Sequence, residues 1–474
     1  MRSRVLSADL ATSADPAAVF AELMATQRVS AHDSSTQGAV WLDSGVSAVS
    51  GRSYLAVSSR AVLSTELGEP VFEWMRREFI AADIDFSDAP PGFRLGWVGW
   101  LGYELRGESM DVAIRSHAST PDAAWLWVDR VIVVDHESQS LSLMALGGGW
   151  TGELQQWREQ MEGLVVRAAQ YGDRPQPSAQ SGPPDTSGQG SPSGPREAPV
   201  ATWRDNDIQY LEMIAQCQHA IVEGEAYQLC LTTNVRVEPA ADPVQTYLAL
   251  RAANPSHHGG FVQAGGVALL SSSPEQFLSI DPAGVIETKP IKGTRRRDSD
   301  PVEDDRLKAE LLASDKERAE NLMIVDLMRN DLGRVCEVGS VVVPKLFEVE
   351  SYATVHQLVS TVSGRLRADV STVEAIAASF PAGSMTGAPK HSATLILDSL
   401  ERSPRGIYSG VFGFVGLDGA VDLAMVIRSI VMDDRGSTIG AGGGITALSV
   451  PTEELAEVKL KAAALLAVLG VHAE

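Results

Sequence analysis

Two pairs of glutamates have the spacing of a metal site. Glu317 and Glu320 stand three residues apart in one predicted helix. Glu454 and Glu457 repeat this spacing in another. Residues three apart project from one face of a helix, and carboxylates that meet from two helices form the hard oxygen site that Mg²⁺ prefers. Each pair alone is also explained as surface charge, since Glu457 and Lys461 have the spacing of an ordinary i, i+4 ion pair.

The residues that follow Glu320 strengthen the case for the first pair. Residues 321–328, NLMIVDLM, are apolar nearly all round, which is typical of a buried helix. A carboxylate at the start of such a helix is costly to bury without a cation or hydrogen bonds. We therefore expect Glu320 to belong to a site.

A basic stretch could supply a nucleophile. Residues 287–297, ETKPIKGTRRR, hold five cations together with a proline and a glycine. Three interpretations fit: a solvated basic turn, an anion-binding loop, or the seat of one reactive amine, Lys292. A lysine amine is a competent nucleophile when desolvation or neighbouring cations lower its pKa.

Two glycine-rich segments could approach an anion. Residues 440–445, GAGGGI, fail the dinucleotide-binding pattern because the last position is Ile445, and they lack the lysine of a phosphate-binding loop. Their glycines let backbone N–H groups approach a carboxylate, or else allow a tight crossing of strands. Residues 381–390, PAGSMTGAPK, form a turn-rich loop that carries the Ser384 hydroxyl.

Three single residues are ambiguous in isolation. His356 stands in an apolar run, where a histidine is more often a hydrogen-bonded core residue than a catalyst. Tyr408 and Arg428 fall in predicted strands. An arginine within AMVIRSIVM should be buried and must then pair with an anion.

The C-terminal part of the chain supplies the elements that position these residues. Strands in hairpins with separate helices indicate an α+β fold rather than a parallel array. The patterns predict a helix over about 205–223, strands within 227–238 and 265–273, a helix from about 302 to 330 that Gly333 ends in a left-handed cap, two strands within 408–433 joined by the turn at Asp418-Gly419, and a last helix from about Thr452.

The N-terminal part alternates short apolar runs with turn signals, which predicts a β-rich subdomain with helices near 72–83 and 152–169. Residues 174–199 contain no Val, Leu, Ile, Phe, Met, Tyr or Trp, so they cannot bury enough apolar surface to fold. We therefore divide the chain into an N-terminal part (1–173), a disordered linker (174–201) and a C-terminal part (202–474).

Composition excludes several classes of protein. The chain has 474 residues, with 39 basic and 61 acidic side chains and a net charge of −22, which argues against nucleic acid or an anionic membrane as a partner. No apolar run reaches the roughly 18 residues of a membrane helix. The three cysteines form no CxxC pair, as expected in a reducing compartment, and we expect a cytoplasmic protein.

The C-terminal part resembles the chorismate-utilising enzymes. Eight motifs occur in the order typical of that family: SSSPEQFL, KPIKGT, ENLMIVDLMRNDLGRV, FPAGSMTGAPK, YSGVFGFV, IRSI, GAGGGI and EELAEVKLKA. The resemblance covers essentially all of 205–474, and the N-terminal part is similar to the family's more divergent front region. It implies the family's fold, in which large antiparallel β-sheets pack in a sandwich with helices on the outside.

The resemblance also assigns roles to particular residues. It implies that Glu320 and Glu457 hold Mg²⁺, with Glu317 and Glu454 beside them, and that the metal binds the ring carboxylate of chorismate. The remaining implied roles are those of Glu275 as general acid, His356 as the active-site histidine, and Gln228, Thr294, Ser384, Tyr408, Arg428, Gly442, Gly443, Gly444 and Lys461 as residues that contact the substrate. Ser384 stands where the family often has threonine, a change that keeps the hydroxyl.

Within the family, the residues at two positions distinguish enzymes that catalyse different reactions. Isochorismate and salicylate synthases carry a lysine at the position of Gln228 and use it to activate water, so its absence argues against water as the nucleophile. Anthranilate synthases typically read PIAGT where this chain reads PIKGT. Lys292 therefore points to the branch of the aminodeoxychorismate synthases, whose product leads to 4-aminobenzoate and folate.

The resemblance implies a covalent route for this branch. Lys292 adds at C2 of the ring while Glu275 protonates the departing C4 hydroxyl, and ammonia then adds at C4 and expels the lysine. No cysteine lies in the elbow of a glutaminase nucleophile, so a separate glutamine amidotransferase subunit is implied. The alternatives are anthranilate synthase component I, which Lys292 disfavours, and a catalytically silent anion- or amino-acid-binding regulator, which the clustered carboxylates disfavour.

One segment of the N-terminal part suggests a second ligand. Residues 40–45, VWLDSG, resemble the position at which anthranilate synthases carry their tryptophan-inhibition motif. Leu42, Asp43 and Ser44 match that motif only in part. Tryptophan is therefore a candidate ligand there, and an ordinary hairpin strand is the alternative.

Overall fold

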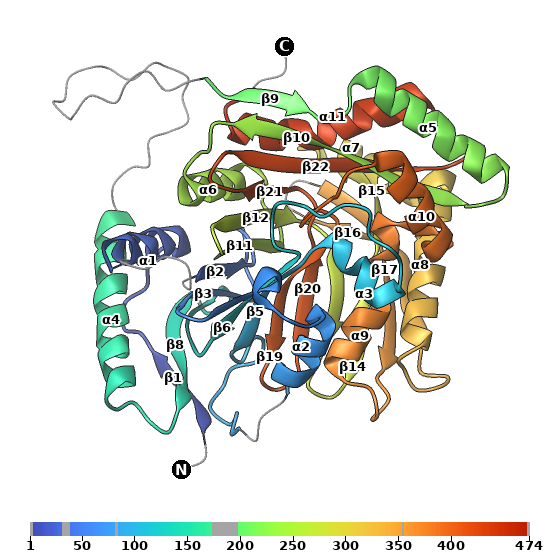
Figure 1. Ribbon diagram of the computed structural model, residues 1–474. Coiled ribbons are helices and arrows are strands. Elements are labelled where there is room, and N and C mark those ends of the chain that lie inside the picture. The colour runs from blue at the N-terminus through green and yellow to red at the C-terminus, as the bar shows by residue number, and fades with distance from the viewer. Residues whose placement is uncertain (1–2, 31–37, 81–83, 173–197, 353–354, 472–474) are drawn as a thin grey trace.

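Two large antiparallel sheets packed face to face form the centre of the protein, and helices cover their outer faces (Figure 1). The computed structural model describes residues 3–30, 38–80, 84–172, 198–352 and 355–471. The predicted α+β sandwich is confirmed. No helix within these ranges is long and apolar enough to cross a membrane.

The larger sheet has twelve strands. In spatial order they are β1 (Arg4–Asp9), β8 (Ser140–Gly147), β7 (Arg130–Asp135), β3 (Arg52–Ser58), β2 (Gly38–Asp43), β11 (His258–Ala264), β12 (Val267–Ser273), β21 (Ser429–Met432), β22 (Ser437–Ile445), β10 (Gln228–Glu238) and β18 (Gly387–Ala388), with β9 (Val200–Trp203) also paired to β10.

The smaller sheet has ten strands. Their spatial order is β15 (Ile291–Arg296), β17 (Val355–Arg365), β14 (Val285–Thr288), β13 (Gln276–Ile280), β20 (Val421–Met425), β19 (Val411–Gly416), β5 (Gly96–Leu101), β6 (Ala123–Val128) and β4 (Ala61–Leu63), with β16 (Val342–Ser351) also paired to β17.

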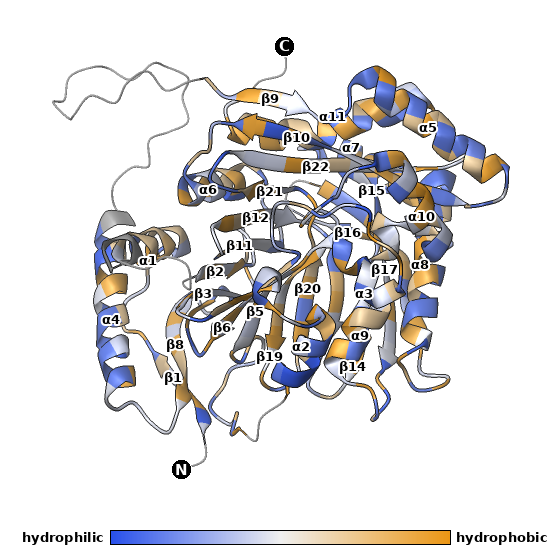
Figure 2. Cartoon of the chain, in the orientation of Figure 1, coloured by the Kyte–Doolittle hydropathy of each residue, from blue (hydrophilic) through white to orange (hydrophobic). Residues whose placement is uncertain are grey.

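Helices pack on the outer face of each sheet. Those on the larger sheet are α1 (Pro16–Ser30), α4 (Glu153–Gly172), α5 (Asp207–Val222), α6 (Pro243–Ala253), α10 (Lys390–Glu401) and α11 (Pro451–Val468). Those on the smaller sheet are α2 (Val71–Glu78), α8 (Asp315–Gly333) and α9 (Thr372–Ser379). Two further helices are α3 (Arg106–Met110) and α7 (Pro301–Ala313). Both hydrophilic and hydrophobic residues occur along α4 and α5, as expected of helices with one face on the core (Figure 2).

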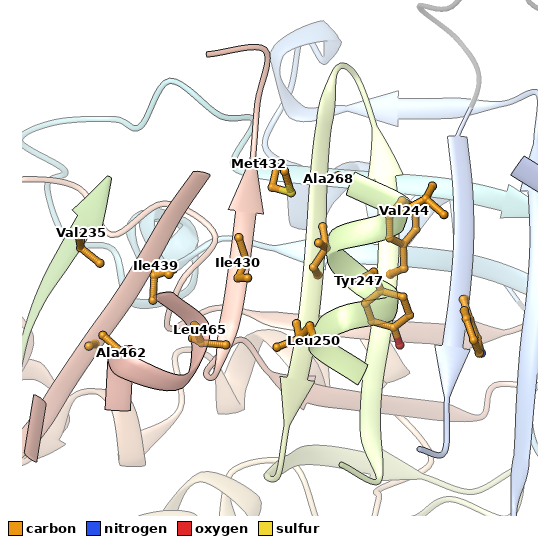
Figure 3. Packing of buried hydrophobic residues seen from close by; sticks show 14 of the residues in the cluster. Val235, Val244, Tyr247, Leu250, Ala268, Ile430, Met432, Ile439, Ala462 and Leu465 are labelled. Carbon is orange, nitrogen blue, oxygen red and sulfur yellow. The ribbon is translucent and has the colours of Figure 1, made fainter. Parts of the chain in front are cut away.

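The core has three layers because each sheet buries side chains on both faces. Residues such as Trp100 and Phe412 fill the space between the sheets. On the outer face of the larger sheet, Leu250 of α6 and Leu465 of α11 join the cluster that contains Ile430 (Figure 3). A third cluster lies between the smaller sheet and α2, α8 and α9. This burial holds α8 and α11 against the strands that carry the site.

The N-terminal and C-terminal parts share both sheets. Strand β2 pairs with β11, and β5 pairs with β19, so in each sheet the early strands form one end and the late strands the other (Figure 1). The division of the chain at residue 173 therefore does not coincide with a boundary between sheets. Most of the predicted linker lies outside the described residues, and its last two positions, 200 and 201, belong to strand β9.

The single helix expected over about 302–330 is two helices, α7 and α8. They break at Ser314, whose backbone is extended and whose side chain accepts a hydrogen bond from the Glu317 backbone N–H. Ser314 is therefore an N-cap that starts α8 just before its glutamates. The left-handed cap expected at Gly333 is wrong, because Gly333 ends α8 without a positive φ.

The strands predicted within 408–433 are three rather than two. β19 and β20 form the expected hairpin through Gly419, which has φ +83°. The chain then crosses to the larger sheet and continues as β21. Arg428 lies in the bend between β20 and β21 with φ +50°, and Tyr408 lies in the turn before β19, so neither is in a strand.

Candidate active site

A cavity of about 550 Å³ opens between the smaller sheet's β15, the larger sheet's β10 and β22, and helices α8 and α11. A 3₁₀ turn at Gly383–Met385 closes one wall. The structure brings most of the predicted site residues to this cavity: Glu275, Lys292, Thr294, Glu317, Glu320, Ser384, Tyr408, Arg428, Gly442, Gly443, Gly444, Glu454, Glu457 and Lys461. It does not bring His356 and Gln228 to it.

Strand β15 presents Lys292 and Thr294 to the cavity through a local irregularity. Its register with β17 shifts between these two residues, at Gly293. Gly293 has φ +78°, and a Cβ there would lie 2.7 Å from a methyl of Leu311 and 2.9 Å from the Glu317 carboxyl carbon. Glycine therefore permits both the turn and the close approach of α8.

The Lys292 amine lies at the centre of the charges in this cavity. It is close enough to lower the pKa values of Glu275, Glu320 and Glu457 by charge attraction. Within the described ranges, however, its side chain makes no hydrogen bond and no ion pair within 4.0 Å. The structure thus presents a free amine to a ligand rather than one end of a salt bridge.

Glu275 is a buried carboxyl at the cavity. The residue is 8% exposed. Burial raises its pKa, while the Lys292 charge and a hydrogen bond from Ser384 oppose the shift. A carboxyl with a raised pKa is suited to protonate a leaving group near neutral pH.

The four glutamates line one side of the cavity from two helices. Burial raises the pKa of Glu320, and repulsion by Glu317 and Glu454 adds to the shift. Burial would also raise the pKa of Glu457, but Lys461 and two further lysines outweigh it and hold that pKa below its usual value. The Lys461 ammonium lies 2.7 Å from Glu457 Oε1, which is the ion pair expected from the sequence.

This donor set is compatible with Mg²⁺. No three acidic, histidine or cysteine side chains of the described residues come together as a ready metal site. Mg²⁺ is usually bound by one or two carboxylates, with waters and substrate oxygens as its other ligands. Glu317 and Glu454 repel the Glu320 carboxylate, and a divalent cation among these carboxylates would relieve that repulsion.

The glycine run of β22 has a packing reason. A Cβ on Gly442 would lie 2.5 Å from the Leu231 carbonyl oxygen of β10, and a Cβ on Gly444 would lie 2.0 Å from the Gln228 amide nitrogen. The tight strand crossing considered for this segment is therefore present. The same residues also expose backbone to the cavity, where the Gly442 carbonyl accepts a hydrogen bond of 2.8 Å from Lys461.

Arg428 differs from its expected environment. It is exposed to the cavity rather than buried in a strand, and its guanidinium has no carboxylate partner within the described ranges. Desolvation lowers its pKa, while Tyr408 and Glu457 oppose the shift. An unpaired guanidinium open to a cavity is available for an anionic ligand.

His356 and Gln228 were expected in the site, but the structure places neither of them in the cavity. His356 is buried outside the cavity, with Nε2 3.0 Å from Asp304 Oδ1 and Nδ1 2.8 Å from the Ser351 hydroxyl. It is the hydrogen-bonded core histidine that base rates favoured. Gln228 lies behind Gly444, and its amide oxygen is buried without a hydrogen bond to the described residues. It supports the cavity wall and does not line the cavity.

Sequence reasoning missed the buried ion pair behind this wall. Arg405 binds both carboxylate oxygens of Glu401, at 2.7 and 2.9 Å. It also donates to the carbonyl oxygens of Met385 and Cys230, which belong to two walls of the cavity. The i, i+4 spacing of Glu401 and Arg405 was the available signal, but such spacing is common on solvated helices.

The segment considered for tryptophan is strand β2. Asp43 is buried and binds Arg251 at 2.5 Å and the Tyr247 hydroxyl at 3.2 Å. A cavity of about 90 Å³ adjoins Leu42, Asp43 and Ser44. Ligand pockets are generally about 300–1,000 Å³, so the space present is small, and tryptophan binding stays a prediction.

Comparison with known proteins identifies the family. The family described as chorismate binding enzyme matches residues 38–467. The chain belongs to this family. The match extends across both parts of the chain, in agreement with the strands that the two parts share. For a chorismate-binding enzyme, unpaired cations in a cavity lined by carboxylates are the expected arrangement, because chorismate is a dianion.

Individual relatives refine this assignment. The chain is 44% identical to an aminodeoxychorismate synthase from Streptomyces pristinaespiralis, over 84% of this chain and 54% of that protein. It is 37% identical to an anthranilate synthase component 1 from Streptomyces coelicolor, over 82% and 76%. The structure of anthranilate synthase component I from Streptococcus pneumoniae TIGR4 matches with a TM-score of 0.67 and 24% identity, over 96% of this chain and 99% of that one. The chain spans about half the length of the aminodeoxychorismate synthases it matches.

Proposed function

We propose that this chorismate-binding enzyme aminates chorismate at C4 to give 4-amino-4-deoxychorismate, for 4-aminobenzoate and folate synthesis. The observation that carries the proposal is the unpaired Lys292 amine, which faces the cavity beside the buried carboxyl of Glu275. Sequence identity of 44% to an aminodeoxychorismate synthase supports the same reaction.

The cavity offers separate groups for the two carboxylates of chorismate. Arg428, in the bend between β20 and β21, and Lys461, on α11, supply positive charge. Glu320 and Glu457 would hold Mg²⁺, whose charge would bind and polarise a substrate carboxylate. Tyr408 is buried against Gly440 and fixes the wall between these groups. The ring of the substrate would then lie over β15.

The proposed chemistry uses two side chains. The neutral Lys292 amine forms a C–N bond at C2, the ring double bond shifts, and the C4–O bond breaks with a proton from Glu275, releasing water. Ammonia then forms a C–N bond at C4, the double bond shifts back, and Lys292 leaves from C2 with a proton. The net change is chorismate plus ammonia to 4-amino-4-deoxychorismate plus water. Ser384, hydrogen-bonded to Glu275, orients the acid.

We propose that a glutamine amidotransferase subunit supplies the ammonia, which free ammonium replaces in vitro. The experiment is to incubate the purified chain with chorismate, Mg²⁺ and ammonium, and to separate the para-amino and ortho-amino products by chromatography and mass. The para product is expected. The ortho product would assign the chain to the anthranilate synthases, and no product would favour a silent regulator.

A pair of variants tests the covalent step. Lys292→Arg keeps the charge but removes the nucleophilic amine, so activity should fall on the order of a thousandfold, and Lys292→Ala should fall as far. Lys289→Arg is the matched control, because Lys289 stands three residues away and does not line the cavity. Intact-protein mass after exposure to chorismate alone should show an adduct in the unsubstituted chain only. A fully active Lys292→Arg variant would refute covalent catalysis.

A further inference from the structure

A buried carboxylate of the N-terminal part holds a segment of the C-terminal part. Glu104 lies in the short 3₁₀ turn Tyr103–Leu105, just after strand β5, and is 3% exposed. One of its carboxylate oxygens accepts a hydrogen bond of 3.0 Å from the Arg405 backbone N–H, and the other accepts one of 2.8 Å from the Gly406 backbone N–H. These two bonds fix both the position and the orientation of the backbone at this point.

Further contacts join the same parts of the chain. The Tyr103 backbone N–H donates to the Gly406 carbonyl oxygen at 2.9 Å. A Cβ on Gly410 would lie 2.1 Å from the Leu101 carbonyl oxygen, so the two backbones touch there. The end of β5 and the turn after it therefore form a seat for residues 405–410, which we call the 405–410 segment.

The 405–410 segment forms part of the cavity wall through Tyr408. The Tyr408 ring lies on Gly440, where a Cβ would come within 2.1 Å of it. The next residue, Ser409, has φ +67°, an angle that residues other than glycine rarely adopt. Contacts from outside the segment must hold such a conformation. The Arg405 side chain also donates to two carbonyl oxygens of the wall, so the segment positions more than one group.

A carboxylate suits the position of Glu104 because donors surround it. Arg106 Nη1 donates to Glu104 Oε1 at 3.0 Å, in addition to the two backbone N–H groups. An ionised carboxylate only accepts hydrogen bonds, whereas a glutamine amide has one oxygen and one NH₂ group. A glutamine at position 104 would turn its NH₂ toward one of these donors. One bond to the 405–410 segment or to Arg106 would then be lost.

We propose that Glu104 is a positioning residue, which holds the 405–410 segment so that Tyr408 is directed at the ligand in the cavity. The inference takes its ligand, chorismate, from the proposed function. It requires only that chorismate binds in this cavity, and it holds whichever nucleophile reacts there. The N-terminal part would thereby contribute to the site without touching the ligand.

The test is a double-mutant cycle on chorismate affinity. Glu104→Gln, Tyr408→Phe and the double variant are made in a Lys292→Ala background, so that no adduct forms, and are titrated calorimetrically with chorismate in Mg²⁺. Each single change should weaken binding about tenfold. If Glu104 acts through Tyr408, the two losses are not independent, and the double variant should bind no more than about twofold worse than the weaker single variant.

A chemically matched control separates positioning from stability. Glu108, four residues further on, accepts hydrogen bonds from two successive backbone N–H groups, those of Val71 at 2.9 Å and Phe72 at 3.0 Å. It does not line the cavity. Glu108→Gln should therefore lower the melting midpoint and leave chorismate affinity unchanged.

A conservative variant guards against misfolding of Glu104→Gln. Glu104→Asp keeps both acceptor oxygens on a shorter side chain, so its affinity should lie between that of the parent and that of Glu104→Gln. If Glu104→Gln does not fold, Glu104→Asp takes its place in the cycle with Tyr408→Phe.

The inference fails if the Glu104 variant binds chorismate within about twofold of its parent, or if Glu108→Gln weakens binding as much. It also fails if Tyr408→Phe binds normally, or if the losses of the two single variants multiply in the double variant. Failure of the proposed function gives a different signature: the unsubstituted chain makes no para-amino product, yet the Glu104 variant still weakens chorismate binding. A chain that binds no chorismate at all would overturn both.

Discussion

Two cavities of this protein share a wall, and they differ in how the charged side chains deep in their walls are paired. The larger cavity has a volume of about 770 Å³ and the smaller about 550 Å³, and both are lined by Tyr408 and Gly440. The Tyr408 ring lies directly on Gly440, where a Cβ would come within 2.1 Å of it. One aromatic side chain thus separates two very different environments.

In the larger cavity two arginines of the wall are paired with carboxylates of the protein. Arg236 binds Asp433 at 2.6 and 3.0 Å, and Arg204 binds Asp205 at 2.7 Å. In the smaller cavity Lys292 and Arg428 face the open space without an ion-pair partner among the described residues. Volume therefore does not locate the chemistry of this protein. We expect the chemistry at the smaller cavity, where charged groups have no partner among the described residues.

Strained backbone is also found at the smaller cavity. Ser409, with φ +67°, follows Tyr408, and Arg428 itself has φ +50°. Side chains other than glycine rarely adopt such angles, and the conformation costs of order 1–3 kcal/mol. Both residues stand at the wall of the smaller cavity or next to it. The strain has a functional reason if it aims Tyr408 and Arg428 at the substrate.

The largest expected effect concerns the acidic wall of the smaller cavity. Glu320→Gln and Glu457→Gln should each lower amination on the order of a thousandfold, because a neutral amide binds Mg²⁺ weakly and the metal contributes several kcal/mol. Turnover is measured against Mg²⁺ concentration, with the melting midpoint as the check on folding. Glu453→Gln, on α11 but outside the cavity, is the control. Near-normal activity of both variants at limiting Mg²⁺ would show that the metal does not bind to these carboxylates.

The next largest expected effect is on stability, and it follows from removing the ion pair buried behind the cavity wall. Arg405 and Glu401 are 1% and 3% exposed in their side chains. Arg405→Met leaves the Glu401 charge buried alone, so the free energy of unfolding should fall by about 3–5 kcal/mol. Denaturant unfolding measures this loss, and adding Glu401→Met should restore part of it. A loss below about 1 kcal/mol would mean that the pair does not hold the wall.

A smaller effect is the pH dependence of Glu275. An acid must carry its proton to donate it, so formation of the Lys292 adduct from chorismate alone should have an alkaline limb that falls about tenfold per pH unit above the raised pKa of Glu275. Burial places this limb above the usual value of 4.5. We measure adduct formation rather than amination because it needs no ammonia, whose unprotonated fraction changes with pH. The Glu275→Gln variant should form the adduct slowly at every pH. A fall of the rate with rising pH that persists in this variant would come from another titrating group.

The smallest expected effect is in the larger cavity. Arg236 and Asp433 are 27% and 21% exposed in their side chains, so solvent screens their attraction. Arg236→Leu should cost between 0 and about 1 kcal/mol of stability and leave amination unchanged. Thermal unfolding and product formation check both statements. A large loss of activity would show that the larger cavity takes part in the reaction and that the contrast between the cavities is wrong.

The local elements were predictable because they depend on nearby residues. The glutamate pairs share a helical face through spacing alone, and the hairpin of β19 and β20 follows from its Asp-Gly turn. The break at Ser314 was missed because apolar spacing continues across it, while the cap depends on the backbone angles of one residue. Arg428 was misplaced because an apolar run does not show where a chain changes sheets.

The sequence by itself determined the family, the sandwich of sheets, and the chemical types that meet in the site: an amine, an acid and four carboxylates. Only the tertiary structure decided which side chains face the cavity. Strand register turned His356 toward Asp304 and Gln357 into the cavity, and packing on Gly444 placed Gln228 behind the wall. The reason is physical: side-chain chemistry is a property of each residue, but the direction of a side chain and the absence of a partner depend on elements far apart in the chain.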